Sequence, residues 1–125
     1  MEGDQLTTEF IPERQHEGWP GIVHGGVIAA ILYEVMENWA YLNGITSMMR
    51  SMDTELKAPA RIGEPIRAVS WLNDRDGREL SVAGRLSVVN RTIAEGTASL
   101  VELSPQQRRR LGIESEPRAE TAGGI

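Results

Sequence analysis

The stretch that decides the fold is GWPGIVHGG at residues 18–26, which runs directly into the apolar segment VIAAILYEVMENWAYL at residues 27–42. Proline and glycine shape the first part as a turn. Asn43-Gly44 then supplies the left-handed residue that commonly ends a helix. The sequence therefore predicts one helix, from Gly25 or Gly26 to Leu42. Its first backbone N–H groups come just after a histidine.

The residue pattern along this helix indicates which sides are covered. Residues 27–32 are apolar all round, which predicts that the first half is buried on all sides. In the second half a polar stripe follows at helical spacing, and Tyr33 lies beside it, one turn before Glu37. The stripe consists of Glu34, Glu37, Asn38 and Tyr41.

The rest of the chain alternates between apolar and polar residues, as strands do. The expected strands are 6–11, 45–56, 64–72, 78–89 and 92–103, with turns at 73–77 and 90–91. Because no crossover helix joins them, the sheet is predicted to be antiparallel. Ser104-Pro105 predicts a short helix to Leu111. Residues 1–4 and 114–125 are expected to lack order, so 1–103 form the domain and 104–125 a short helix and tail.

Composition narrows the class of protein. The chain has 125 residues, 40% of them hydrophobic and 25% charged, as expected for one soluble domain. It has no cysteine, which excludes disulfides, thiolate metal sites and cysteine nucleophiles. The net charge of −5 argues against a nucleic-acid partner. Residues 1–5 are acidic and lack the apolar region of a signal peptide, and the longest apolar run, residues 27–33, is too short to span a membrane. We therefore expect a cytoplasmic protein with no membrane partner.

Residues 17–30, followed by 53–65 and three hairpin-linked strands, resemble the hotdog-fold thioesterases of the phenylacetate-pathway (PaaI) type. The resemblance spans roughly residues 7–103. It implies an α+β hotdog fold, in which an antiparallel sheet wraps around one long central helix. It also implies a homodimer, often a dimer of dimers (a homotetramer), that hydrolyses acyl-CoA at the dimer interface. No metal and no cofactor are implied, apart from the coenzyme A of the substrate.

Thioester hydrolysis needs a group that polarises the carbonyl. The start of a helix presents unpaired N–H groups and partial positive charge, which suit a developing oxyanion. Neither Gly25 nor Gly26 has a Cβ, so a thioester can approach the backbone there. By resemblance, the Gly25 amide polarises the carbonyl and His24 shapes the pocket. The alternative is that the glycines only permit packing and His24 is a turn residue.

The reaction also needs a base. The resemblance places the family's carboxylate at the position of Tyr33 and a second polar residue near Met49. A tyrosine with a pKa near 10 is a poor base at neutral pH. Glu37 is therefore our first candidate for orienting a water, with Asn38 as a helper and Glu34 second. The alternative is a hydrogen-bonded polar patch at the dimer interface.

Other side chains are weaker candidates for contacts to substrate. Arg50, Lys57 and Arg61 would either meet the phosphates of coenzyme A or remain solvated. Four methionines would either line an acyl pocket or belong to the core, namely Met36, Met48, Met49 and Met52. The three tryptophans, Trp19, Trp39 and Trp71, are expected to be packing anchors.

Two functional hypotheses from different classes remain. The first is an acyl-CoA thioesterase for a small or medium acyl or aryl group. The second is a non-catalytic hotdog protein that binds acyl-CoA or a small aromatic ligand, having Tyr33 in place of the acid. A hotdog dehydratase or hydratase fits less well, because His24 has only distant acids. Release of thiol from a panel of acyl-CoAs separates the first two.

Overall fold

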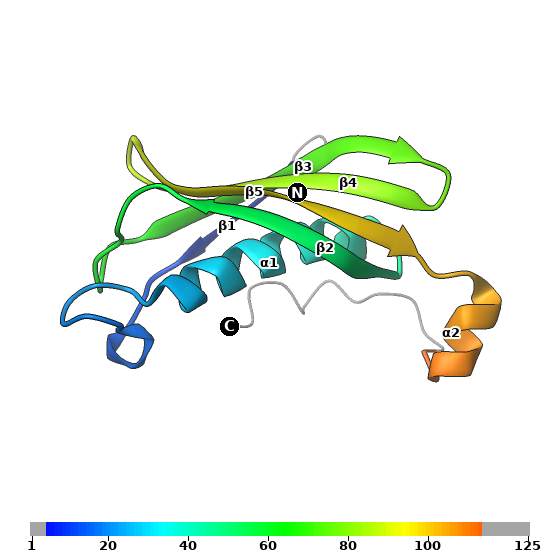
Figure 1. The fold of residues 1–125 in the computed structure, drawn as a ribbon, viewed down its shortest axis with the longest axis horizontal. Helices are drawn as coiled ribbons and strands as arrows, with labels where there is room; N and C mark the ends of the chain where they lie inside the picture. The colour runs from blue at the N-terminus through cyan, green and yellow to red at the C-terminus, as the bar shows by residue number, and fades with distance from the viewer. Residues whose placement is uncertain (1–4, 114–125) are drawn as a thin grey trace.

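The computed structural model describes residues 5–113 (Figure 1). Five strands form one antiparallel sheet, a long helix lies across one face, and a short helix follows the last strand. The strands are β1 (Gln5–Phe10), β2 (Ser47–Leu56), β3 (Ile66–Asp76), β4 (Glu79–Val88) and β5 (Arg91–Glu102). The helices are α1 (Gly25–Leu42), α2 (Pro105–Leu111) and a 3-10 turn, η1 (Arg14–His16).

The sheet has the strand order β1-β3-β4-β5-β2, and every neighbouring pair is antiparallel. β2 follows α1 in the chain yet pairs with β5, so it forms one edge of the sheet. The other edge is β1, which pairs with β3. Figure 1 shows α1 running beneath the sheet, with the loop that precedes it at one end of the molecule and α2 at the other.

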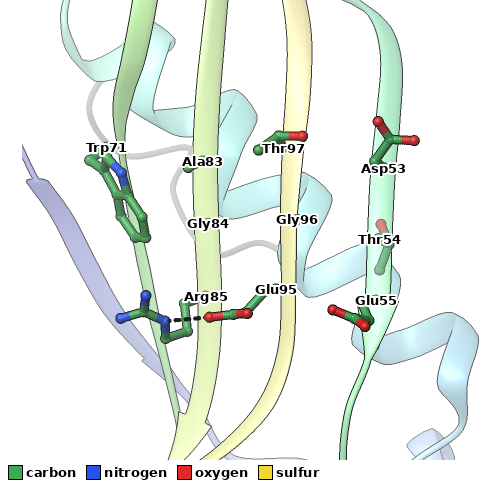
Figure 2. Close-up of a pocket in the computed structure, with 10 residues that line it drawn as sticks. All are labelled: Asp53, Thr54, Glu55, Trp71, Ala83, Gly84, Arg85, Glu95, Gly96 and Thr97. Atoms are coloured by element: carbon green, nitrogen blue, oxygen red, sulfur yellow. Dashed lines mark hydrogen bonds and ion pairs between the residues drawn. The ribbon is translucent and has the colours of Figure 1, made fainter.

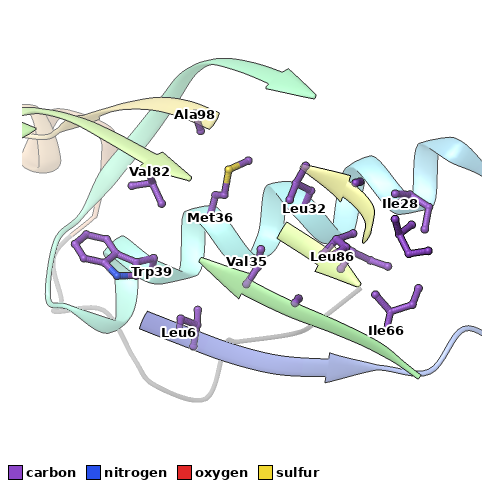
Figure 3. Close-up of a cluster of buried hydrophobic side chains, with 14 of the residues drawn as sticks. Leu6, Ile28, Leu32, Val35, Met36, Trp39, Ile66, Val82, Leu86 and Ala98 are labelled. Carbon is purple, nitrogen blue, oxygen red and sulfur yellow. The ribbon is translucent and has the colours of Figure 1, made fainter. Parts of the chain in front are cut away.

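The core lies between α1 and the sheet (Figure 3). The helix buries one face, which includes Ile28, Leu32, Val35, Met36 and Trp39. The sheet contributes alternating residues of its central strands, which are buried against the helix. On β3 these are Ile66, Ala68 and Ser70, and on β4 they are Leu80, Val82, Gly84, Leu86 and Val88.

Two glycines let the helix approach the sheet closely. A Cβ added at Gly84 would lie 2.9 Å from Met36 Cγ. At Gly96 it would lie 2.8 Å from Leu32 Cδ2 and 2.6 Å from the Asp53 carbonyl oxygen. The glycines therefore leave room for the large side chains of α1, and Met36 belongs to the core rather than to an acyl pocket.

The helix and strand types were predicted correctly, but two turns were misplaced. Residues 73–76 continue β3 rather than forming a turn, because β3 and β4 stay paired through a register shift between Leu72 and Asp74. The chain reverses only at Gly77, whose φ is +61°. The next turn lies at Val89 and Asn90, with Val89 at a φ of 53°, one residue before the predicted position.

The prediction that the first half of α1 is buried on all sides is wrong for the single chain. Gly26 is exposed, and Ala29 and Ala30 are only partly buried. The sheet covers one side of the helix, which leaves the opposite side open. The short helix α2 is confirmed, with Ser104 as its cap. The expectations for residues 1–4 and 114–125 fall outside the described part of the chain. Within that part, no helix is both long and apolar enough to cross a membrane.

Candidate active site

His24 closes the start of α1 with its own side chain. Its Nδ1 atom accepts a hydrogen bond of 2.8 Å from the Gly26 N–H. Its carbonyl oxygen accepts from the N–H groups of Val27 (2.9 Å) and Ile28 (3.1 Å). Within residues 5–113, the Gly25 N–H has no hydrogen-bond partner. One free donor therefore remains at the helix start, and Gly26 cannot offer its amide to a substrate while the cap is in place.

The loop before α1 is held firmly, so the Gly25 amide has a fixed position. Residues 19–22 form a turn, closed by a 2.9 Å bond from the Ile22 N–H to the Trp19 carbonyl oxygen, with Pro20 second and Gly21 third at a φ of +77°. Outside the turn, the Val23 N–H donates to the Ala60 carbonyl oxygen (2.9 Å).

Two hollows meet at Gly25. One, of about 290 Å³, is lined by Val23, Gly25, Ile28 and residues 56–60. The other, of about 410 Å³, is lined by Gly18, Trp19, Val23, His24 and Gly25. Trp19 is not the packing anchor that we predicted, because 79% of its surface is exposed. Trp39 is buried as predicted.

Tyr33 and Glu37 form a pair on the open side of α1, as their spacing predicted. The Tyr33 hydroxyl donates a hydrogen bond to the Glu37 carboxylate. The negative charge of Glu37, followed by partial burial, raises the pKa of Tyr33 above its ordinary value. Burial raises the pKa of Glu37; Tyr33 opposes this shift, and the charge of Glu34 adds to it. Within the described chain, Glu37 Oε2 is buried without a hydrogen-bond partner.

This arrangement gives Tyr33 and Glu37 different chemical roles. Because its pKa is raised, the Tyr33 phenol stays protonated at neutral pH and acts as a donor. Glu37 is an acid whose pKa has moved toward neutrality, which suits a general base. A buried oxygen without a partner is costly unless a ligand or water satisfies it.

Gly25 and Glu37 are far apart in one chain. They are twelve residues apart on the same helix, and a rise of about 1.5 Å per residue separates them by about 18 Å along its axis. A thioester carbonyl held by the Gly25 amide is therefore out of reach of Glu37 in the same chain. Glu34 lies only about 4.5 Å closer than Glu37 to Gly25 along the helix axis, so it too is out of reach of the carbonyl.

The other predicted site residues lie away from the Tyr33–Glu37 pair. Asn38 is buried about 100° round the helix from Glu37, so it is not beside the carboxylate as we expected of a helper. Met49 packs partly buried against the core, and Met48 is exposed on β2.

The three predicted phosphate contacts each lie beside a carboxylate. Arg50 lies 3.8 Å from Glu79, and both side chains are exposed. Lys57 binds Glu55 (3.4 Å) and Glu95 (3.2 Å). The Arg61 backbone N–H donates to Glu64 (2.9 Å). Lys57 lines the hollow of about 290 Å³ that also contains Gly25.

A further hollow, of about 430 Å³, was not predicted from the sequence (Figure 2). It lies on the sheet face away from α1, because its Ala83 and Thr97 alternate with glycines that face the helix. Glu95 is paired with Arg85 (3.0 Å), whose guanidinium lies 5.4 Å from the Trp71 ring centroid. The charges of Glu95 and Arg85 therefore neutralise one another. The two residues are neighbours across β4 and β5, which their spacing along the chain does not reveal.

No metal centre was expected. Among residues 5–113, no group of three or more histidine, aspartate and glutamate side chains is placed to hold a metal ion.

The sequence matches no family model, and no curated protein matches it at a significant level. Solved structures match it closely in fold. A thioesterase superfamily protein is 24% identical with a TM-score of 0.74, covering 78% of this chain and 49% of its own. This chain thus spans about half the length of that protein.

Two further matches carry more specific descriptions. A hypothetical thioesterase from Streptococcus pneumoniae TIGR4, solved with coenzyme A, is 8% identical with a TM-score of 0.78, covering 83% of this chain and 85% of its own. The PaaI protein of the E. coli phenylacetic acid degradation operon is 10% identical with a TM-score of 0.75, covering 80% and 73%. The chain has the α+β hotdog fold of these thioesterase superfamily proteins, as its resemblance to the PaaI type implied.

Proposed function

We propose that this chain is an acyl-CoA thioesterase whose active sites form between two copies. The observation that carries the proposal is the unbonded Gly25 N–H, which opens onto two hollows at the start of α1. A fold shared with thioesterases, one of them solved with coenzyme A, supports the same conclusion. The substrate is a small or medium acyl or aryl thioester.

In the proposed reaction, the thioester oxygen accepts a hydrogen bond from the Gly25 N–H, which stabilises the negative charge that develops there. Glu37 takes a proton from a water, and the resulting hydroxide attacks the carbonyl carbon. The tetrahedral intermediate collapses with cleavage of the C–S bond. The thiolate leaves and takes the proton back from Glu37, so the products are the carboxylic acid and free coenzyme A.

Tyr33 holds Glu37 in this scheme. Its hydroxyl donates a hydrogen bond to the Glu37 carboxylate, which keeps the base in one orientation. The same bond opposes the rise in the pKa of Glu37 that burial causes, and so favours the anionic form of the base. His24 keeps the Gly26 amide occupied and so leaves Gly25 as the donor. In this scheme Tyr33, a hydrogen-bond donor, occupies the position of the family's carboxylate. The carboxylate of Glu37 lies one turn further along the helix.

The second copy is required because Gly25 and Glu37 are about 18 Å apart in one chain. Two α1 helices that run antiparallel would bring Gly25 of one protomer toward Glu37 of the partner subunit. The open side of α1 carries small residues, Gly26 and Ala30, beside Tyr33 and Glu37, which permits close approach of another helix.

The first experiment measures thiol release from a panel of acyl-CoAs by the full chain and by Glu37→Gln. Loss of a general base is expected to lower kcat by about 10²- to 10⁴-fold, while size-exclusion chromatography with light scattering shows the same oligomer. Unchanged turnover in the variant removes Glu37 from the mechanism. Binding of acyl-CoA without turnover by the unmodified chain favours the second hypothesis, a non-catalytic binding protein.

The second experiment tests whether the two groups come from different subunits. Gly25→Pro removes the N–H at the first helical position, which proline tolerates well, and it breaks no hydrogen bond among residues 5–113. His24 already has the extended backbone that precedes proline (φ −59°, ψ 136°). Gly25→Ala is the matched control, because it keeps the amide.

Each single variant, Gly25→Pro or Glu37→Gln, inactivates every site of its own dimer. After the two are unfolded together and refolded, hybrid dimers hold one doubly altered site and one unaltered site. Random pairing makes about half of the dimers hybrid, so about a quarter of the unmodified activity is expected to return. If both groups acted from the same chain, no activity would return.

A further inference from the structure

The last turn of α2 carries three consecutive arginines, Arg108, Arg109 and Arg110, which we call the arginine cluster. Arg109 and Arg110 are exposed, and Arg108 is partly buried. Within residues 5–113, none of the three guanidinium groups has an ion pair or a hydrogen bond. In a chain with a net charge of −5, the cluster is therefore a local concentration of positive charge that no carboxylate of the described chain neutralises.

The helix holds this cluster in a fixed position although it has only seven residues. At its start, the Gln107 N–H donates to Ser104 Oγ (3.1 Å) and the Ser104 N–H donates to Gln107 Oε1 (2.8 Å), which forms a capping box. At its end, Gly112 has a φ of +77° and its N–H donates to the Arg109 carbonyl oxygen (3.1 Å). Arg78 ties the helix to the sheet by donating to Gln107 Oε1 (3.2 Å).

The arginines also complement the partial negative charge at the end of a helix, which is the simplest reason for a basic residue there. Successive residues of a helix point about 100° apart, so the cluster spreads its donors over about 200° of the surface. Such a broad face suits a ligand with more than one anionic group, and a guanidinium binds a phosphate through two parallel hydrogen bonds. Because α2 lies beyond residues 7–103, the resemblance to the thioesterases assigns it no role.

The fold places α2 beside the end of α1. The Leu103 N–H, just before α2, donates to the carbonyl oxygen of Thr46, which follows α1 closely in the chain (2.9 Å). Gly25 and Leu42 stand at opposite ends of α1, about 26 Å apart along its axis. Figure 1 accordingly shows α2 at the end of the molecule away from the loop that leads into Gly25. The cluster is thus remote from the Gly25 amide of its own chain.

We propose that the arginine cluster binds the phosphates of coenzyme A whose thioester lies at Gly25 of the partner subunit. The inference rests on the proposed function, in which antiparallel α1 helices bring Gly25 of the partner subunit toward Glu37. Leu42 is only about 7.5 Å beyond Glu37 along the axis, so α2 lies at the same end of the dimer as that site. A whole pantetheine arm separates the phosphates from the thioester carbonyl, which agrees with a phosphate site away from Gly25.

The basic side chains that the sequence suggested for this role are less suitable. Arg50 lies beside Glu79, and Lys57 binds two carboxylates. A phosphate that approached either side chain would also meet these negative charges. The arginine cluster offers three cations without such competition in the described chain.

The first test measures KM and kcat with the acyl-CoA that is hydrolysed fastest and with the matching acyl-pantetheine, which has the same thioester but no phosphate. The variants are Arg109→Gln and a triple variant, in which Arg108, Arg109 and Arg110 are all changed to glutamine. Arg67→Gln is the matched control for the single variant. Arg67 is exposed, has no ion pair within residues 5–113, and alternates on β3 with buried residues that face α1.

The triple variant is expected to raise KM for the acyl-CoA about tenfold with kcat nearly unchanged, because the lost contacts contribute to binding rather than to the chemical step. Arg109→Gln should cause a smaller rise, and Arg67→Gln none. Unchanged constants for acyl-pantetheine would show that the fold is intact. An unchanged KM for acyl-CoA, or an equal rise with both substrates, contradicts the phosphate site and leaves the arginines as stabilisers of α2.

Hybrid dimers of Gly25→Pro and Glu37→Gln chains test which subunit supplies the cluster. Their unaltered site combines Gly25 of the Glu37→Gln chain with Glu37 of the Gly25→Pro chain. Adding the triple change to the Gly25→Pro chain is expected to raise KM, because the α2 of that chain lies near this site. Adding it to the Glu37→Gln chain should have no effect. The opposite pattern means that the cluster serves its own chain, which overturns the proposal.

Titration calorimetry with free coenzyme A separates this inference from the proposed function. If the unmodified chain hydrolyses no thioester, the proposed function fails, and binding of coenzyme A tests the cluster alone. Binding that the triple variant weakens about tenfold, and that Arg67→Gln leaves intact, supports the cluster. Absence of binding, or binding that the triple variant does not change, contradicts it.

Discussion

The hydroxyl of Tyr33 and the carboxylate of Glu37 meet across one turn of α1, on the side of the helix that the sheet leaves open. This contact shifts the pKa of each residue. Tyr33 remains a neutral donor, because the charge of Glu37 raises its pKa. Glu37 has a raised pKa from burial, and the hydrogen bond from Tyr33 limits that rise.

Tyr33→Phe removes the hydroxyl and with it the interaction that lowers the pKa of Glu37. We expect the pKa of Glu37 to rise further, so the acidic limb of the kcat/KM profile against pH moves to higher pH. Because Tyr33 is 40% exposed, water weakens the bond and the movement is modest. Activity on the alkaline plateau falls less than it does near pH 5. A profile displaced to lower pH contradicts this assignment, and a uniform loss at every pH indicates a purely structural role.

Glu37→Gln is expected to change the pH dependence of stability. A carboxyl whose pKa is higher in the folded than in the unfolded chain binds a proton more tightly when folded. Glu37 therefore contributes stability below the ordinary pKa of glutamate, and this contribution is lost as the pH rises through its raised value. Glutamine does not titrate, so the variant lacks this loss. The free energy of unfolding of the variant should therefore increase relative to that of the unmodified chain as the pH rises from 4 to 8. Urea unfolding at several pH values and one protein concentration measures the difference. A difference that shrinks with increasing pH contradicts the raised pKa.

Much of the fold could be predicted because its signals are local. Alternation of apolar and polar residues predicted a strand at 78–89, and β4 runs from Glu79 to Val88. The i, i+4 spacing of Tyr33 and Glu37 was enough to predict that they are neighbours on one side of the helix. The C-terminal end of β3 was missed because it depends on pairing with β4 through a register shift, which has no local signal.

The candidate site was harder to predict, because its details depend on tertiary contacts. Whether Gly25 or Gly26 keeps a free amide is decided by the position of the His24 ring. The exposure of Trp19 depends on whether another element covers it, and none in the described chain does. Lys57 meets Glu95 only because β2 and β5 are neighbours. The sequence predicts a candidate site at the start of α1, but it does not indicate which atoms remain available there.

His24→Ala is expected to destabilise the protein by about 1 kcal/mol, because the Gly26 N–H loses its cap. Asparagine is among the best capping residues, so His24→Asn is expected to recover most of that stability. The imidazole also lines the hollow beside Gly25, so the asparagine variant should keep a lowered kcat/KM. Thermal unfolding and acyl-CoA hydrolysis are measured on both variants. Full activity in His24→Asn shows that the histidine acts only as a cap.

Gly96→Ala is expected to destabilise the protein more than Gly84→Ala, although both glycines face α1. At Gly84 the added methyl meets the flexible side chains of Met36 and Leu32, which can adjust at a cost of about 1–3 kcal/mol. At Gly96 it meets the Asp53 carbonyl oxygen at 2.6 Å, an atom of the paired strand β2 that cannot move without disturbing the ladder with β5. The cost there should exceed about 3 kcal/mol.

Urea unfolding of the two glycine variants provides the comparison, and Thr97→Ala serves as the control on the opposite face of β5. We expect the control to remain within about 0.5 kcal/mol of the unmodified chain, because Thr97 is exposed. Since β2 is an edge strand, Gly96→Ala should also speed hydrogen exchange in β2 before it affects β3. Equal costs at the two glycines would mean that β2 shifts freely against β5, in which case β2 is not a rigid edge in the folded chain.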